Sequence, residues 1–271
     1  MTESRHRAVK AYENQPWIHS RDARALRILS EYMEPEARFE ELGVEDTIVV
    51  FGSARILPED VAKERLEEVK KAGGDVAKAE RDLHMSMYYE AARELSRRLT
   101  VWSMSLSEGQ QRFVICSGGG PGIMEAANRG AHEGGGLNIG LNISLPFEQN
   151  DNPYISESLS LEFHYFFMRK FWFTYLAKAI VVMPGGFGTL DEFMEVVTLV
   201  QTLKIKKSLP IVLFGKEFWE KVINFQTLID FGTISADDVN LFFITDSIDE
   251  AYEYLTKKLL EGGLPEPGAH L

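Results

Sequence analysis

The chain has 271 residues, enough for one large domain or two small ones. Its composition, 45% hydrophobic and 26% charged, is close to the average of soluble globular proteins and argues against a disordered or fibrous chain. The formal net charge of −12 repels polyanions and argues against a nucleic-acid partner, although a local pocket can still hold one small anion.

The chain has one cysteine, Cys116, so no disulfide can form within it. The first residues lack the apolar segment of a leader, and no later run reaches the roughly 18–20 apolar residues of a membrane span. We therefore expect a soluble, cytoplasmic protein with no membrane partner. No metal site is expected, because no metal-ligand spacing surrounds His19, His84, His132, His164 or Cys116.

Residues 1–45 are polar and predict an N-terminal helical extension. Ser20 is a plausible cap for a helix in this segment. The spacing of Leu26, Leu29 and Met33 predicts one narrow apolar stripe on that helix, which needs a partner surface.

From residue 46 onward, strand and helix patterns alternate. The apolar, β-branched run 47–51 is typical of a buried parallel strand. A charged helical segment at about 58–107 follows, which we interpret as an insertion because it has too few large apolar residues for a core of its own. Further strands are predicted at 113–116, 137–143, 159–163, 179–183, 210–214 and 241–244. Helices are predicted from the glycine turn 118–122 to about 133, over about 165–178, from the glycine turn 185–188 to about 203, and over 247–261.

This alternation predicts a single Rossmann-like α/β domain over residues 46–261, with a doubly wound parallel sheet and helices on both faces. In such sheets, ligands bind at the carboxyl ends of the strands. The tail over 262–271 is predicted to fray.

A glycine-rich turn, Gly118-Gly119-Gly120-Pro121-Gly122-Ile123-Met124, joins a strand to a helix, with Pro121 suited to the first helical position. Glycines let a ligand approach the backbone, and a helix N-terminus offers unpaired N–H groups to an anion. The turn fits neither the dinucleotide fingerprint nor a P-loop, so we expect no nicotinamide or other cofactor. A purely structural turn is the alternative.

A second such turn is Pro184-Gly185-Gly186-Phe187-Gly188-Thr189-Leu190-Asp191-Glu192. Its last four residues also match a capping box, in which Thr189 caps the helix and Glu192 reaches back to the cap N–H. Two glycine-rich helix N-termini at one sheet edge favour a binding site for a phosphate and a sugar. Gly52 and Ser53 end the first strand, but no nucleophile elbow surrounds Ser53, so serine hydrolase chemistry has little support.

An adjacent pair of cations, Arg169 and Lys170, lies in the aromatic segment 166–173. Consecutive helical residues point about 100° apart, so we expect one cation to enter the cleft and the other to point outward or toward a phosphate. The alternative is that the aromatic residues are core and both cations are solvated.

These motifs resemble the LOG (LONELY GUY) family, older name "possible lysine decarboxylase", whose characterised members are nucleoside 5′-monophosphate phosphoribohydrolases. Residues 184–192 match the family pattern P-G-G-x-G-T-x-x-E. Residues 118–124 match G-G-G-x-x-G-x-M with the last glycine one place early, and the Arg-Lys pair also aligns. The resemblance covers roughly residues 46–260 and points to the longer bacterial form.

The resemblance implies hydrolysis of the N-glycosidic bond of a purine nucleotide to free base and ribose 5-phosphate, with Arg169 and Glu192 as the catalytic pair. Glu192 would stabilise an oxocarbenium-like sugar and Arg169 would orient the substrate. The expected substrate contacts are Gly52, Ser53, Gly118, Gly119, Gly120, Gly122, Met124, Glu148, Met168, Lys170, Gly185, Gly186, Phe187, Gly188, Thr189 and Thr198.

The base stays open between a cytokinin-type nucleotide and a general purine nucleotide such as AMP, because the family's Met-His-x-Arg-Lys is here Phe166-Phe167-Met168-Arg169-Lys170. No lysine lies in a context that suggests a pyridoxal Schiff base. A nucleotide-binding sensor or carrier without hydrolysis is the alternative function.

A homodimer is expected, because the helix after Thr189 is apolar almost all round and its outer side needs a cover. The residues concerned are Phe193, Met194, Val196, Val197, Leu199 and Val200. An interaction surface on the N-terminal helix is a further alternative.

Overall fold

The computed structural model describes residues 8–106, 111–146, 151–261 and 266–268. Seven parallel strands form one sheet in the order β4-β3-β2-β1-β5-β6-β7. The strands are β1 (Thr47–Phe51), β2 (Val114–Ser117), β3 (Asn138–Ile143), β4 (Ser160–Phe163), β5 (Ala177–Val182), β6 (Ile211–Phe214) and β7 (Phe243–Thr245). The predicted doubly wound α/β fold is confirmed.

Helices cover both faces of the sheet. The α-helices are α1 (Gln15–Ile18), α2 (Arg24–Glu41), α3 (Glu59–Ala72), α4 (Val76–Met104), α5 (Ile123–Glu133), α6 (Phe166–Tyr175), α7 (Phe187–Gln201), α8 (Lys216–Val222), α9 (Phe225–Asp230) and α10 (Ile248–Leu260). Short 3-10 helices are η1 (Ala11–Glu13), η2 (Glu157–Leu159) and η3 (Ala236–Leu241).

The sheet separates two apolar clusters, because side chains alternate between the faces of a strand. Ile48 and Val50 of β1 pack with residues of α4, α5 and α10. Val49 and Phe51 of the same strand pack with residues of α2, α6, α7 and α8. Strands buried on both faces explain why continuous apolar runs predicted them.

The direction of winding reverses at β1. The chain passes outward from β1 through β2 and β3 to β4, and then returns to the other side of β1 to form β5, β6 and β7. The carboxyl ends of β1 and β5 are therefore the switch point where such folds bind ligands.

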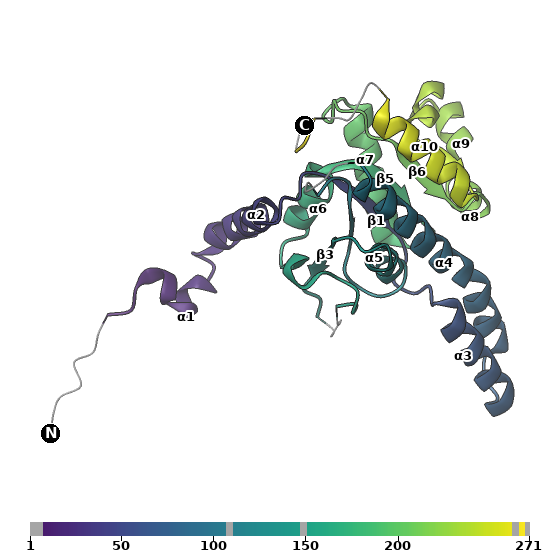
Figure 1. The fold of residues 1–271 in the computed structure, drawn as a ribbon, viewed down its shortest axis with the longest axis horizontal. Helices are drawn as coiled ribbons and strands as arrows, with labels where there is room; N and C mark the ends of the chain where they lie inside the picture. Colours follow the sequence, from purple (N-terminus) through teal and green to yellow (C-terminus); the bar gives the residue numbers. More distant parts are fainter. Residues whose placement is uncertain (1–7, 107–110, 147–150, 262–265, 269–271) are drawn as a thin grey trace.

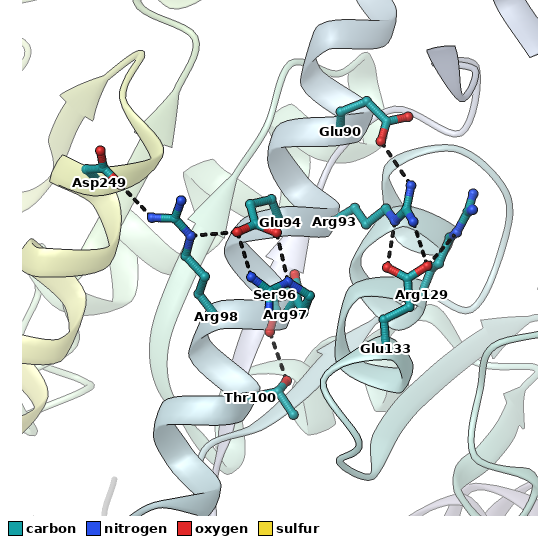
Figure 2. Close-up of polar contacts among 10 residues, drawn as sticks. All are labelled: Glu90, Arg93, Glu94, Ser96, Arg97, Arg98, Thr100, Arg129, Glu133 and Asp249. Atoms are coloured by element: carbon teal, nitrogen blue, oxygen red, sulfur yellow. Dashed lines mark hydrogen bonds and ion pairs between the residues drawn. The ribbon is translucent and has the colours of Figure 1, made fainter. Parts of the chain in front are cut away.

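Helix α4 belongs to the core although its segment was predicted as an insertion. It buries Tyr89, Leu95 and Leu99 against the sheet. Its polar side is tied to two other helices (Figure 2): Arg93 donates to both carboxylate oxygens of Glu133 on α5 at 2.7 Å, and Arg98 pairs with Asp249 on α10. Of this segment, α3 and the first part of α4 extend beyond the body, on the side away from α1 and α2 (Figure 1).

The N-terminal helix differs from its prediction. Helix α2 begins at Arg24 with Ala23 as its N-cap and without a side-chain cap, and the Ser20 hydroxyl has no hydrogen-bond partner among the described residues, so Ser20 is not the cap. The predicted apolar stripe is exposed: Leu26 is 48%, Leu29 50% and Met33 56% accessible.

The buried side of α2 is a different one. Tyr32 and Phe39 pack against Trp172 of α6, with ring centroids 5.7 and 5.3 Å apart. Glu31 reinforces this contact, because its carbonyl accepts from the Trp172 indole at 3.0 Å.

Two helix boundaries also differ from the predicted ones. Helix α5 starts at Ile123 with Gly122 as its N-cap, so Pro121 lies in the turn and is not the first helical residue. Helix α6 ends at Tyr175 because β5 already begins at Ala177.

Helix α7 is covered in part by its own chain. Phe193 and Val196 are buried, and Val197, Leu199 and Val200 pack against the same cluster. Gln201 donates to Asp238 of η3 at 2.8 Å. Two apolar side chains of α7 stay strongly exposed, Phe187 at 92% and Met194 at 40%, so a second copy as the cover of its outer side stays a prediction.

No helix of the described ranges is long and apolar enough to cross a bilayer.

A buried ion pair closes the amino end of the sheet. Asp46 is fully buried, accepts from Arg112 Nε and Nη2 at 2.8 Å each and from the Phe113 N–H at 2.6 Å. We expect Asp46→Ala to lower the free energy of unfolding by about 3–5 kcal/mol, because it deprives a buried guanidinium of its carboxylate. Urea denaturation measures the change.

The matched control is Asp249→Ala, which removes the exposed partner of Arg98 in Figure 2 and should leave the urea midpoint almost unchanged. Equal, small effects of the two substitutions would contradict a structural role for the buried pair.

Candidate functional site

A cleft of about 560 Å³ lies at the switch point of the sheet. It is lined by Phe51, Gly52, Ser53, Ala54, Arg55, Gly118, Met124, Ile143, Leu145, Phe166, Arg169, Phe173, Gly186, Phe187, Gly188, Thr189, Leu190, Asp191 and Glu192. The structure thus brings together the first-strand turn, both glycine turns and the arginine of the aromatic segment.

Backbone hydrogen bonds hold the three turns against one another. The Ser53 N–H donates to the Pro184 carbonyl at 3.1 Å, and the Ser53 carbonyl accepts from the Ile123 N–H at 3.0 Å. Gly122 allows this approach, because its φ is +71° and a Cβ there would lie 2.4 Å from the Ser53 carbonyl oxygen. The turn after β1 is therefore the centre of the site.

The N-terminus of α7 opens into the cleft. Its N-cap is Gly186, no side chain caps it, and Thr189 is already the third helical residue. The capping-box alternative is therefore wrong. The N–H groups of Phe187, Gly188 and Thr189 have no acceptors within the helix, and such an end attracts an anion.

Arg169 lines the cleft and is half-buried. Its Nε donates to the Leu141 carbonyl at 2.7 Å, and its guanidinium stacks 4.9 Å from the centroid of Phe173. Gly118 leaves room for it, since a Cβ there would lie 2.6 Å from Nη2. Burial lowers the pKa of Arg169 and Glu192 opposes that shift, yet a guanidinium stays protonated at neutral pH.

Glu192 lies one turn into α7 and lines the same cleft. Burial raises the pKa of its carboxyl to about 7, although Lys170 and Arg169 pull it down. Among the hydrogen bonds and ion pairs of the described residues, none uses the Glu192 carboxylate. A partly buried carboxylate without a partner is costly for a fold, and such groups gather at functional sites.

Lys170 points away from the cleft. Its ammonium lies 2.8 Å from Asp191 and 2.8 Å from Glu195, both on α7. Arg169 and Lys170 thus face different surroundings, as their spacing predicted, but the partners of Lys170 are carboxylates of the protein itself.

Several predicted contacts do not line the cleft. Gly119, Gly120, Gly122 and Gly185 shape the turns behind its wall, and Met168 is buried in the core. Thr198 lies two turns farther along α7, where its hydroxyl donates to the Met194 carbonyl. The predicted contact Glu148 lies outside the described residues.

The first glycine turn is held from behind by Asn152, which the sequence did not single out. Its buried amide donates to the carbonyls of Gly119 and Gly120 at 3.1 and 3.2 Å and to Asn128 at 3.0 Å. An isolated asparagine in a loop gives no sequence signal, because its partners come from distant segments.

Arg55 is a second cation of the cleft that sequence reasoning missed. It follows the β1 turn, is exposed, and lines the cleft with Phe166 and Phe187, which are 54% and 92% accessible. Its position directly after Gly52-Ser53-Ala54, at the end of a central strand, is the signal that could have found it.

A larger hollow, of about 640 Å³, lies on the opposite face of the sheet around α4. Its charged side chains already have partners, including Arg93 with Glu133 and Arg97 with Glu94 (Figure 2). The described residues contain no group of three or more His, Cys, Asp or Glu side chains that could hold a metal ion.

The fold and the cleft define a doubly wound α/β protein with an open helix N-terminus at its switch point. The family model "Possible lysine decarboxylase" matches residues 124–255. A relative from Oryza sativa subsp. japonica, "Cytokinin riboside 5'-monophosphate phosphoribohydrolase LOG", is 30% identical over 182 residues, 66% of this chain and 68% of the relative. The chain belongs to the LOG family.

Two solved structures are also similar. The X-ray structure of a structural-genomics target, TM1055, is 20% identical with a TM-score of 0.47, over 78% of this chain and 99% of that one. The molybdenum cofactor carrier protein of Chlamydomonas reinhardtii is 17% identical with a TM-score of 0.42, over 79% of this chain and 98% of that one.

Proposed function

We propose that the protein hydrolyses the N-glycosidic bond of a purine nucleoside 5′-monophosphate, giving the free base and ribose 5-phosphate. The observation that carries this proposal is Glu192, a carboxylate without a partner among the described residues, in the same cleft as a half-buried arginine and an open helix N-terminus. Membership of the LOG family supports it, because a relative's name gives the same reaction on cytokinin riboside 5′-monophosphate.

The phosphate would bind at the N-terminus of α7, where the N–H groups of Phe187, Gly188 and Thr189 and the helix dipole favour an anion. Arg55 supplies a full positive charge at the neighbouring turn. Phe166 and Phe187 present exposed aromatic faces on which a base can stack.

Cleavage of the glycosidic bond passes through a sugar with oxocarbenium character. The ionised Glu192 would stabilise this cation and orient the attacking water, and Arg169 would orient the substrate and offset negative charge near the reacting bond. The water adds to the anomeric carbon, its proton passes to the departing base, and the bond to the base breaks.

The protein is also proposed to act as a homodimer. Met194 is an exposed apolar side chain on α7 that a second copy would cover beside the site. Light scattering should therefore give about twice the 30.7 kDa of one chain for the active protein. A fully active monomer would contradict the dimer.

Glu192→Gln should abolish base release while nucleotide binding stays within about tenfold, because the amide keeps the shape and loses the charge needed in the transition state. Chromatography of AMP, GMP, CMP and modified adenylates after incubation measures the free base. Nucleotide binding without base release by the unaltered protein would instead support a sensor or carrier.

The pH dependence checks the same carboxylate. Because the pKa of Glu192 is about 7 and the ionised form acts, kcat/KM should rise with pH and level off above about pH 7. A raised folded-state pKa means that ionising Glu192 costs stability as pH increases, so Glu192→Gln should be more stable than the unaltered protein above pH 7. Lost stability would point to a structural role.

AMP should be hydrolysed with a kcat/KM at least on the order of 100-fold above that of adenosine, because binding energy at the phosphate is used at the glycosidic bond. Steady-state kinetics on the two substrates measures the ratio. Equal kcat/KM values for AMP and adenosine would contradict a phosphate site at the N-terminus of α7.

A further inference from the structure

Among the described cations at or beside the cleft, Lys170 is the one whose charge is balanced by carboxylates of the protein. Its side chain is 18% exposed and its ammonium touches two carboxylates. Both contacts are ion pairs at 2.8 Å, so two carboxylates of α7 balance the charge of this one ammonium. It does not line the cleft, so the predicted substrate contact of Lys170 has no support from the lining of the cleft.

The two carboxylates have a specific relation to Glu192. Asp191 precedes it by one residue on α7 and Glu195 follows it by three. Lys170 itself follows Arg169 directly on α6. The ion pairs therefore join the helix that carries Arg169 to the helix that carries Glu192, at the level of those two residues.

We propose that Lys170 is a positioning residue for the reaction: it clamps α6 to α7 through Asp191 and Glu195, and so holds an ionised Glu192 in the same cleft as Arg169. This inference rests on the proposed function. It assigns to Lys170 a role that acts through Glu192 rather than through the substrate.

The charges around Glu192 give this clamp a measurable consequence. Arg169 and Lys170 face it from α6, Asp191 and Glu195 flank it on α7, and Arg55 lines the same cleft from the turn after β1. Burial raises the pKa of Glu192, Lys170 is the foremost group that lowers it, and the two flanking carboxylates raise it. Lys170 thus counteracts the rise in the pKa of Glu192 that its own partners, Asp191 and Glu195, cause.

Lys170→Met removes the charge and keeps most of the aliphatic stem. We expect kcat at pH 7 to fall about tenfold or more, the acidic limb of the pH profile to move up by about one pH unit, and KM to change by less than about threefold. Lys170→Arg, which can still bridge two carboxylates, should recover most of the activity.

Glu195→Gln gives the opposite sign and guards against a Lys170 variant that does not fold. It removes a negative charge beside Glu192 and leaves Lys170 paired with Asp191, so the acidic limb should move to lower pH. The matched control is Lys221→Met, which breaks an exposed ion pair inside α8 and should leave kcat and the pH profile unchanged.

A second measurement needs no turnover. The stability difference between Glu192→Gln and its parent, followed against pH, reports the pKa of Glu192 by linkage. In the Lys170→Met background this difference should keep growing to higher pH than in the unaltered background. If the protein releases no base at all, the proposed function fails, while this titration still tests the clamp.

The proposal is overturned if Lys170→Met raises KM alone and leaves both the pH profile and the stability titration where they were. That result would assign Lys170 to substrate binding. It is also overturned if Lys170→Met and Glu195→Gln move the acidic limb in the same direction.

Discussion

The placement of β1 between β2 and β5 is the constraint on which the rest of the molecule depends. Crossovers between parallel strands are right-handed, so a chain that winds first to one side of β1 and then to the other must put its helices on opposite faces. The helices therefore diverge at the carboxyl ends of β1 and β5. Three turns fill the opening, and their backbone groups are bonded to one another around Ser53.

This arrangement separates the parts of the site by physical role. The turns supply backbone N–H groups and space, which requires glycine, and the neighbouring helices supply charge. Arg169 and Glu192 come from α6 and α7, which pack on the same face of the sheet. Their relative position is therefore set by helix packing and by the ion pairs of Lys170 rather than by the turns.

The strands could be predicted from the sequence because each is a short apolar run buried on both sides, and such runs have few alternatives. Helix ends were harder. Thr189 and Glu192 fit a capping box by spacing, but the helix begins two residues earlier, at Phe187, so the spacing was satisfied at the wrong place. The Ser20 prediction failed for a related reason, since α2 begins at Arg24 with Ala23 as its N-cap, three residues after Ser20.

Individual contacts depend on neighbours that no local pattern contains. Gly118 and Arg169 were found from their motifs and do meet in the cleft. Asn152 and Arg55 were missed, because the first acts through distant carbonyls and the second is a single charge after a strand. Thr198 shares a helix with Glu192, lies two turns farther along it and is not among the residues that line the cleft.

The burial of Cys116 has a practical consequence. The thiol lies within the sheet below Arg169, 2% accessible, and burial raises its pKa, so it is neither exposed nor ionised at neutral pH. Because Cys116 is the one cysteine of the chain, the unaltered protein offers thiol-directed probes no accessible thiol. A fluorophore or spin label on one cysteine introduced in the exposed stripe of α2, for example in place of Leu29, would report on that surface alone, without first removing a residue from beneath the cleft.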